Sequence, residues 1–219
     1  MQYLIVIIFS SAIMASIHPG FVSISEICSE LKIQASYSTE NNFTGAIVAG
    51  YKSKKAYMAK IPANALCEVN EVARVRGVGL KIFDAYRPVK AVHFFQQWAK
   101  LPENNLELKQ LYYPSFTRRE LFEKGFIAQK SSHSRGSAID LTLFDLKTGK
   151  DLDMGSGFDY FDEISQTESP LITSEQLRNR MLLKEMMESK GFRNFSKEWW
   201  HFSYRPEPYP NQYFDFDVD

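Results

Sequence analysis

The chain has 219 residues, of which 44% are hydrophobic and 24% are charged, and its 26 Lys and Arg residues balance 26 Asp and Glu residues. This composition is typical of a globular protein and excludes a collagen-like or intrinsically disordered chain. Because the formal net charge is zero and no long Lys/Arg run occurs, the chain lacks the basic footprint of a protein that binds nucleic acid through phosphates. We therefore expect a small or neutral partner and no nucleic acid.

An apolar run covers residues 4–13, and small residues follow at Ala15 and Ser16. This pattern is typical of a secretory signal peptide, which we place at residues 1–22, ahead of a domain at 23–219. The run is about 10 to 12 residues long, whereas a bilayer-spanning helix needs about 20, so we expect no stable membrane anchor after processing. The location predicted is periplasmic or secreted. The alternatives are a membrane anchor and a buried N-terminal strand in a cytoplasmic protein. They stay open because residues 1–3 carry no basic charge, whereas a signal peptide usually begins with a basic segment.

The chain contains two cysteines, Cys28 and Cys67. Their spacing matches no zinc-binding, thioredoxin or cysteine-protease pattern. In an exported protein they could form a disulfide that ties the N-terminal segment to the first long helix; the alternative is a pair of inert buried thiols.

Three helices are predicted from periodicity and from end signals. The first follows Pro62 and stops at Gly77, and the second covers 89–98, directly after Pro88. The third begins at Thr173, which has capping-box spacing to Gln176, and ends at residues 190–191.

Strands are predicted at 80–83, 137–144 and 192–204, and the Thr-Gly-Lys sequence at 148–150 favours a hairpin turn. No internal repeat or linker interrupts the chain after residue 30. We therefore predict one α+β domain with a mainly antiparallel central sheet flanked by helices.

Two short segments, 131–140 and 198–201, contain the residue types of a hydrolytic metal site. They contribute His133, Asp140, Glu198 and His201. Catalytic zinc takes three nitrogen or oxygen ligands and an open fourth position, and a nearby carboxylate that is not a ligand can serve as general base. We therefore predict one zinc ion per chain at the sheet. Two further histidines, His18 and His93, are read as ordinary surface or core residues.

The local sequence suggests how these residues could converge. Gly136 and its small neighbours allow a turn between His133 and the strand that carries Asp140. Glu198 and His201 are three residues apart, and a flat strand would place them on opposite faces. We therefore expect a turn or bulge between them, with Glu198 at a loop end and His201 at the start of a strand.

A third polar segment, 84–88, lies between a predicted strand and a predicted helix. Its Arg87 is always charged and could stabilise the oxyanion of a tetrahedral intermediate. The alternative is a structural ion pair with Asp84 or another carboxylate.

These motifs resemble those of the D-alanyl-D-alanine dipeptidases of the VanX type, which belong to the wider group of lysostaphin-like, D-Ala-D-Ala and sonic-hedgehog-like zinc peptidases. The resemblance runs from about Tyr37 to the C-terminus. It rests on the Ser-x-His-x-x-Gly-x-Ala-x-Asp pattern at 131–140, Glu-x-Trp-His at 198–201 and Tyr-Arg-Pro at 86–88. It also includes Asn-Phe-Thr-Gly at 42–45 and Glu-Pro-Tyr-Pro at 207–210.

The resemblance implies hydrolysis of D-alanyl-D-alanine to two D-alanines. It assigns zinc to His133, Asp140 and His201, the role of catalytic base to Glu198, and stabilisation of the intermediate to Arg87. It further implies that Asp159 and Tyr37 bind the free ammonium of the dipeptide. A buried carboxylate there would explain a preference for dipeptides, because an acylated or extended chain would leave that charge unpaired, typically at a cost of about 1 to 3 kcal/mol.

Two other functions are compatible with the same residues. A D,D-carboxypeptidase or peptidoglycan endopeptidase would use the same metal chemistry in a more open cleft. A non-catalytic zinc-stabilised module would capture a wall peptide without turnover, but such a module would not need a base at Glu198. A signal peptide favours salvage of the dipeptide outside the inner membrane over a cytoplasmic role in glycopeptide resistance.

Overall fold

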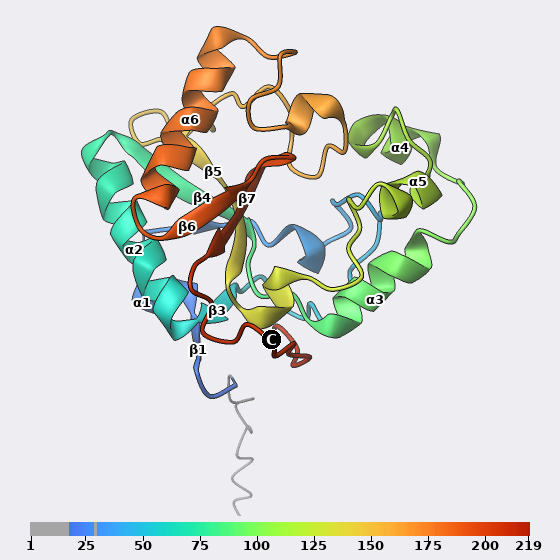
Figure 1. Cartoon of the computed structure of the whole chain (residues 1–219), viewed down its shortest axis with the longest axis horizontal. Coiled ribbons are helices and arrows are strands. Elements are labelled where there is room, and N and C mark those ends of the chain that lie inside the picture. Colours follow the sequence, from blue (N-terminus) through green and yellow to red (C-terminus); the bar gives the residue numbers. More distant parts are fainter. Residues whose placement is uncertain (1–17, 29) are drawn as a thin grey trace, which may run out of the picture.

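A computed structural model describes residues 18–28 and 30–219 of the chain (Figure 1). A central five-stranded sheet has α2 and α6 on one side, while α3, α4 and α5 lie on the other side of the molecule. The elements in chain order are β1 (Phe21–Ser23), α1 (Ile24–Ile27), β2 (Lys32–Ile33), η1 (Ser36–Ser38), β3 (Tyr57–Ala59), α2 (Lys60–Val75), β4 (Val78–Asp84), α3 (Val89–Trp98), α4 (Leu106–Tyr112), α5 (Arg118–Glu123), η2 (Ser132–Arg135), β5 (Ala138–Asp145), η3 (Glu163–Ser165), α6 (Ser174–Glu188), β6 (Phe192–Phe195) and β7 (Glu198–Tyr204).

The central sheet has the strand order β2-β4-β5-β7-β6. The pairs β4–β5, β5–β7 and β6–β7 are antiparallel, but β2 pairs with β4 in parallel. The prediction of a single α+β domain is confirmed, whereas the sheet is mixed rather than mainly antiparallel. The reason is that β3 and α2 lie between β2 and β4 in the chain, and such a long crossover returns the chain in the same direction. A separate two-stranded sheet pairs β1 with β3.

The three predicted helices are present as α2, α3 and α6. The bounds of α3 coincide with the predicted 89–98, and α6 begins with the expected capping box, in which Thr173 and Gln176 cap each other. Sequence patterns did not indicate α4 and α5. The signal that could have found α5 is its own capping box, formed by Thr117 and Glu120.

The predicted strands at 80–83 and 137–144 correspond to β4 and β5. After β5 the chain turns at 145–150 as expected, and its returning limb pairs through one bridge between Phe144 and Asp151. The prediction of one strand over 192–204 is wrong, because β6 and β7 form a tight antiparallel hairpin instead. The turn at Ser196 and Lys197 contains no Gly, Pro, Asn or Asp, and its single Ser is a weak turn signal.

Two hydrophobic clusters fill the interior. One lies between the sheet and the helices α2 and α6, and it includes Leu66, Val69, Leu80, Ile82, Ile139, Leu141, Leu143, Leu183, Met186 and Phe202. The other is mainly aromatic and includes Tyr37, Phe43, Tyr51, Tyr86, Phe95, Trp98, Phe161 and Phe214. Because side chains alternate along a strand, β5 buries Ile139 and Leu141 in the first cluster and turns Asp140 to the opposite face.

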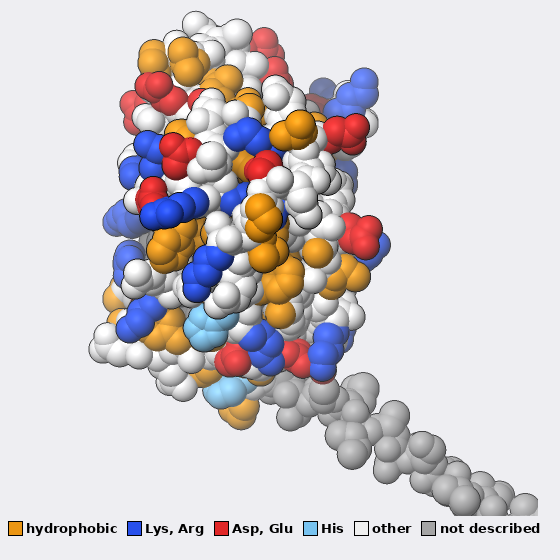
Figure 2. All heavy atoms as spheres, turned by 90° about the vertical axis from the view of Figure 1, so that its right-hand side faces the viewer, with side chains coloured by type: hydrophobic (Ala, Val, Ile, Leu, Met, Phe, Trp, Pro, Cys, Tyr) orange, Lys and Arg blue, Asp and Glu red, His pale blue; other side chains and the backbone are white. Residues whose placement is uncertain are grey.

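The surface beside α3, α4 and α5 carries both signs of charge. Figure 2 shows basic and acidic side chains interspersed over this face, with apolar side chains between them. Several exposed leucines belong to this part of the chain, namely Leu101, Leu106 and Leu111.

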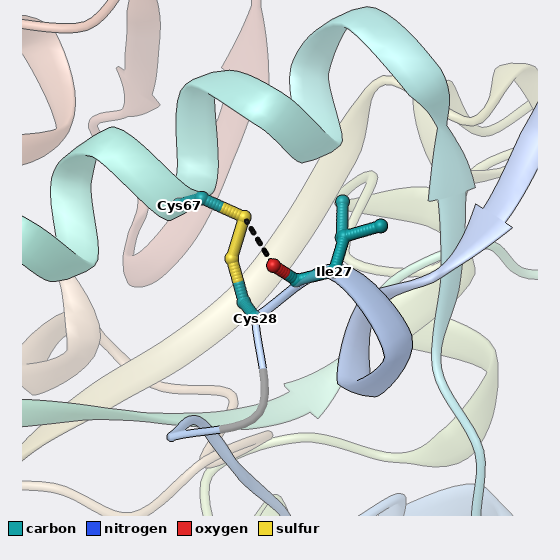
Figure 3. The surroundings of a disulfide bond; sticks show 3 residues. All are labelled: Ile27, Cys28 and Cys67. Carbon is teal, nitrogen blue, oxygen red and sulfur yellow. Dashed lines mark hydrogen bonds between the residues drawn. A yellow bond between two sulfur atoms is a disulfide. The ribbon is translucent and has the colours of Figure 1, made fainter.

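A disulfide joins Cys28 to Cys67, as one of the two alternatives expected, and it ties the end of α1 to α2 (Figure 3). The two Cα atoms are 5.7 Å apart, and Cys67 Sγ lies 3.7 Å from the carbonyl oxygen of Ile27. No helix within 18–28 and 30–219 is long and apolar enough to cross a bilayer.

The predicted signal peptide lies mostly outside the described residues, since residues 1–17 are not among them. Its last residues, Phe21 and Val22, belong to β1, and Phe21 is buried against Tyr86 and Phe214. Cleavage directly after residue 22 would therefore remove Phe21 and Val22 of β1 from the folded domain.

The last residues of the chain pack behind two loops of the domain. The N–H of Phe214 donates to the carbonyl of Ser134 at 2.8 Å, and the Tyr86 hydroxyl donates to the carbonyl of Phe216 at 2.9 Å. Val218 forms a parallel bridge with Tyr51. This tail thus contacts the segments that carry His133 and Arg87.

Candidate active site

Three polar residues lie side by side, in one row, on three neighbouring strands of the central sheet. Asp140 on β5 is paired with Asp84 on β4 and with His201 on β7. A register shift between Ile82 and Asp84 ends the regular β4–β5 pairing at this row. The row lies on the face opposite the helices α2 and α6, because its strand neighbours Ile139 and Leu141 pack in that cluster.

His133 reaches this row from the short helix η2. The Ser131 hydroxyl caps this helix by accepting from the N–H of His133 at 3.2 Å. Gly136 then turns the chain into β5 with a φ of 70°, and a Cβ atom at this position would overlap the ring of Phe21. The predicted role of Gly136 in the turn is therefore confirmed.

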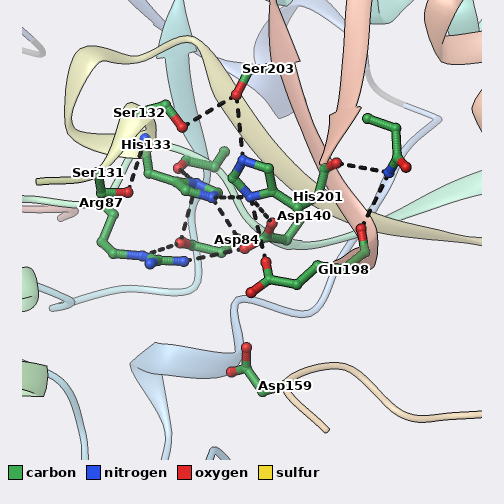
Figure 4. A network of polar contacts seen from close by, with 12 residues as sticks. Asp84, Arg87, Ser131, Ser132, His133, Asp140, Asp159, Glu198, His201 and Ser203 are labelled. Carbon is green, nitrogen blue, oxygen red and sulfur yellow. Dashed lines mark hydrogen bonds and ion pairs between the residues drawn. The ribbon is translucent and has the colours of Figure 1, made fainter. Parts of the chain in front are cut away.

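The side chains of His133, Asp140 and His201 converge on one point, and their nearest ligand atoms lie within 4.8 Å of one another (Figure 4). His133 Nε2 is 3.1 Å from His201 Nδ1 and 3.3 Å from Asp140 Oδ2, and His201 Nδ1 is 3.0 Å from Asp140 Oδ1. His133 Nδ1 donates to the carbonyl of Ala85 at 2.6 Å, which leaves a lone pair on Nε2 toward this point. Two imidazole nitrogens and a carboxylate arranged in this way can hold a divalent metal ion.

Charge and burial act in opposite directions on these three groups. Burial disfavours the charged form of Asp140, but His133 and His201 outweigh it and hold the pKa of this carboxyl well below its usual range. Burial lowers the pKa of His133 and so favours the neutral imidazole that binds a metal. Burial also opposes the charge on His201, yet the hydrogen bond to Asp140 raises its pKa.

Glu198 lies at the edge of this cluster, at the first position of β7. The pairing of β6 with β7 slips between Asn194, opposite Phe202, and Phe195, opposite Glu198, so β7 carries extra residues there. This irregularity is the expected bulge, and it brings Glu198 Oε2 within 4.0 Å of His201 Nδ1. His201 itself is inside the strand rather than at its start.

The environment of Glu198 favours its protonated form. Burial is the largest cause, the nearby charge of Asp140 adds to it, and together they raise the pKa of Glu198 to about 7, although His201 opposes the shift. A carboxyl group with a pKa near neutrality can both take up and release a proton at physiological pH.

Arg87 approaches the cluster from the end of β4. Its Nε donates to Asp84 Oδ2 at 2.9 Å and its Nη2 donates to Asp140 Oδ2 at 3.2 Å. The Tyr51 hydroxyl donates to the other oxygen of Asp84 at 2.7 Å. The ion pair with Asp84, one of the two expected roles, is therefore present, and the same guanidinium also lines the cleft that contains His133, Asp140 and His201.

Asp159 and Tyr37 lie across the cleft from His133, Asp140 and His201. The Tyr37 hydroxyl donates to Asp159 Oδ2 at 2.8 Å, and both residues are buried. In Figure 4 the Asp159 carboxylate points from its loop toward Glu198. Burial raises the pKa of Asp159 well above its usual range, and the charge of Asp140 adds to this shift.

All seven residues predicted for the site line a single cleft of about 420 Å³. The cleft is therefore large enough for a small peptide and is polar at its base. His18 and His93 do not line it. Two contributors were not indicated by the sequence: Tyr51, which orients Asp84, and Asn194, whose amide donates to the carbonyls of Glu198 and His201 at 3.2 and 3.1 Å.

The chain is similar to known proteins over nearly its whole length. Residues 18–219 match the peptidase family M15, described as D-Ala-D-Ala dipeptidase. A D-alanyl-D-alanine dipeptidase of Enterococcus faecium is 47% identical over 199 residues, which cover 91% of this chain and 98% of that protein. The corresponding enzyme of Enterococcus faecalis is 45% identical with the same coverage, and that of Streptomyces coelicolor is 38% identical, covering 90% of this chain and 98% of its own.

Proposed function

Because this chain belongs to the D-Ala-D-Ala dipeptidase family, we propose that it hydrolyses D-alanyl-D-alanine to two molecules of D-alanine. The observation that carries the proposal is the convergence in one cleft of three metal-ligand side chains, a carboxyl group with a pKa near 7 and a buried carboxyl group across from them. These are the parts that a metal-dependent peptidase specific for a short substrate needs.

The metal that fits the donor set best is zinc, held by His133, Asp140 and His201, with one ion per chain. Tetrahedral zinc with bonds of about 2.0 to 2.2 Å separates its ligand atoms by roughly 3.3 Å. Here His133 Nε2 lies 3.1 Å from His201 Nδ1 and 3.3 Å from Asp140 Oδ2, while His201 Nδ1 lies 3.0 Å from the other carboxylate oxygen, Oδ1, so the donor atoms are close to that spacing. Zinc, when bound, supplies Lewis acidity toward the peptide carbonyl and toward water.

Glu198 serves as the general base in this proposal. Its carboxylate takes a proton from the attacking water and passes it to the amine of the departing D-alanine. Two features support this role: it lies beside the metal ligands but farther from His201 than Asp140 does, and its pKa is about 7. The carboxyl group can therefore change its protonation state twice in each turnover.

Arg87 stabilises the negative charge that develops on the peptide oxygen. The guanidinium is held in place by Asp84 and Asp140 and shielded by the aromatic rings of Tyr37 and Phe95, over which it lies at 5.1 and 5.4 Å. A fixed cation needs little reorganisation as the charge develops, which is the condition for electrostatic catalysis.

Asp159 and Tyr37 bind the free ammonium of the dipeptide. Ionised Asp159 would pair with the ammonium, and the Tyr37 hydroxyl already contacts this carboxyl group. An acyl group on the substrate nitrogen would remove the charge and bring bulk against a buried pocket, so this end of the cleft limits the substrate to dipeptides.

We also propose that residues 1–22 direct export, with the mature domain following them. The apolar run of residues 4–13 and the disulfide between Cys28 and Cys67 support this proposal, because disulfides persist in oxidising compartments. Outside the inner membrane the enzyme would salvage the dipeptide from cell-wall material.

The test is release of D-alanine from D-Ala-D-Ala by the purified chain, measured before and after chelation and again after zinc is restored. We expect turnover that the chelator abolishes and zinc restores, and no turnover of N-acetyl-D-Ala-D-Ala. If the acetylated dipeptide is cleaved as well as the free one, the chain acts as a D,D-carboxypeptidase or endopeptidase, and the roles of Asp159 and Tyr37 are wrong.

A further inference from the structure

The loop that presents Asp159 has little regular structure of its own. It runs from the end of the β5 turn to α6 and contains only the short helix η3. Asp159 has a φ of 57°, in the left-handed region that costs energy for a residue with a side chain. Contacts from outside the loop must therefore keep the Asp159 carboxylate directed into the cleft.

Arg180 of α6 provides such contacts at both ends of the loop. Its Nε donates to the carbonyl of Met154 at 2.6 Å, and its Nη1 donates to the carbonyls of Ile164 and Gln166 at 2.9 and 2.6 Å. Asp159 lies between these attachment points in the chain. One rigid guanidinium thus closes the loop on either side of the residue that faces the substrate.

Arg180 is buried, whereas most arginine side chains are exposed to solvent. Its side chain is fully buried, and among the described residues it forms no ion pair with a carboxylate. The burial of a charge without an ion pair is costly, and here the main compensation comes from three loop carbonyls, with a weaker contact from Nη2 to the Ser156 hydroxyl at 3.5 Å and the nearby charge of Asp153. An apolar residue would fill the same space without the free-energy cost of burying a charge. We therefore attribute the role of Arg180 to its hydrogen bonds with the loop.

The loop is also connected to the strand that carries the proposed base. The indole N–H of Trp199, next to Glu198 in β7, donates to the hydroxyl of Ser156 at 3.0 Å. The Arg180 guanidinium lies 5.8 Å from the centre of the Trp199 ring. Arg180 therefore sits where the Asp159 loop meets β7.

We propose that Arg180 is a positioning residue for recognition of the substrate's free amino group: by fixing residues 154 and 164–166, it holds Asp159 in register with the reacting peptide bond. Arg180 does not contact the cleft itself. The inference rests on the proposed function, in which Asp159 binds the ammonium of the dipeptide. It predicts that Arg180 controls the preference for a free amine rather than the chemical step.

The test compares Arg180→Met and Arg180→Lys with the matched control Arg178→Met, which removes an exposed arginine of the same helix. Each zinc-loaded enzyme is assayed with D-Ala-D-Ala and with propionyl-D-alanine, in which hydrogen replaces the amino group. For Arg180→Met we expect a loss of about 10- to 100-fold in kcat/KM for the dipeptide, mainly through KM, because misplacing a binding group by about 1 Å has effects of this size. Turnover of propionyl-D-alanine should change by less than about threefold.

Arg180→Lys should show an intermediate loss, since an ammonium cannot reach all three carbonyls from one plane. Arg178→Met should behave as the unsubstituted enzyme. Hydrogen exchange provides a second measurement: amides of residues 155–166 should exchange faster in Arg180→Met, while those of β4, β5 and β7 keep their protection.

An equal loss on both substrates, or no loss on either, would overturn the role in amine recognition, and unchanged exchange in 155–166 would overturn the anchoring of the loop. Failure of the proposed function is distinguishable, because the unsubstituted enzyme would then not cleave D-Ala-D-Ala at all. In that case the role in amine recognition falls with it, and hydrogen exchange alone decides whether Arg180 anchors the loop.

Discussion

Replacement of Asp159 by Asn tests how the cleft selects its substrate. The change keeps the size of the side chain and its ability to accept a hydrogen bond from the Tyr37 hydroxyl, which is 2.8 Å away. It removes only the capacity to become a carboxylate. The substrate ammonium would then be buried opposite a neutral amide.

The expected size of the effect follows from the burial of the pair. Asp159 is 4% exposed, so water cannot replace the missing charge. Removal of one partner from a buried ion pair typically costs about 3 to 5 kcal/mol, which corresponds to a loss of about two to three and a half orders of magnitude in kcat/KM. Propionyl-D-alanine has no ammonium, and its turnover should change by less than about threefold.

The assay measures D-alanine release from both substrates by the zinc-loaded Asp159→Asn enzyme and its parent, with zinc content determined for each. The result that would refute the reasoning is a similar loss on both substrates, because Asp159 would then support the fold or the metal rather than the amine. Full activity of the variant on D-Ala-D-Ala would show that another group binds the ammonium.

Other expected outcomes concern the base, the guanidinium and the disulfide. Glu198→Gln should retain zinc but lose about 10² to 10⁴ in kcat, and near-normal turnover in that variant would exclude the role of general base. Because a base acts only when deprotonated and burial raises the pKa of Glu198, kcat/KM of the parent should fall toward acid pH and approach a slope of about tenfold per pH unit. A profile that stays flat down to pH 5 would contradict this. Arg87→Lys should lower kcat by about 10²-fold without loss of zinc, since Lys cannot donate to Asp84 and into the cleft at the same time. Steady-state kinetics would test the fall in kcat, and metal analysis would test the retention of zinc. Reduction of the bond between Cys28 and Cys67, which are 39 residues apart, should remove about 4 kcal/mol of stability and lower Tm by roughly 10 °C, and an unchanged thermal transition would show that the bond contributes little.

The sequence predicted the three longest helices, α2, α3 and α6, because their signals are local. Pro88 sets the start of α3, and the pair Thr173 and Gln176 sets the start of α6, so neither depends on distant parts of the chain. The convergence of His133, Asp140 and His201 was also accessible, because the donor types and the Gly136 turn lie in two short segments. The need for a bulge between Glu198 and His201 followed from the two-residue period of a strand.

Other features depend on tertiary pairing and have no local signal. The parallel pairing of β2 involves only Lys32 and Ile33, too few residues for a pattern. The contact between Tyr37 and Asp159 spans 122 residues, and only the family resemblance suggested it. Arg180 looks like an ordinary charged residue of α6, since its burial is decided by the loop that folds over it. The end of the proposed leader is a further example, because a chain that began at residue 23 would lack Phe21, which packs in the aromatic cluster.

The C-terminal tail has a consequence for when activity first arises. Phe214 forms a hydrogen bond with Ser134, next to His133, and Phe216 forms one with Tyr86, next to Arg87. Both phenylalanines are synthesised after all the residues that line the cleft. A nascent chain therefore lacks the support behind the segments that carry His133 and Arg87 until synthesis has passed residue 216. If the chain is exported unfolded, that support forms only after the tail has crossed the membrane. In that case the site would be completed only in the compartment that receives the tail.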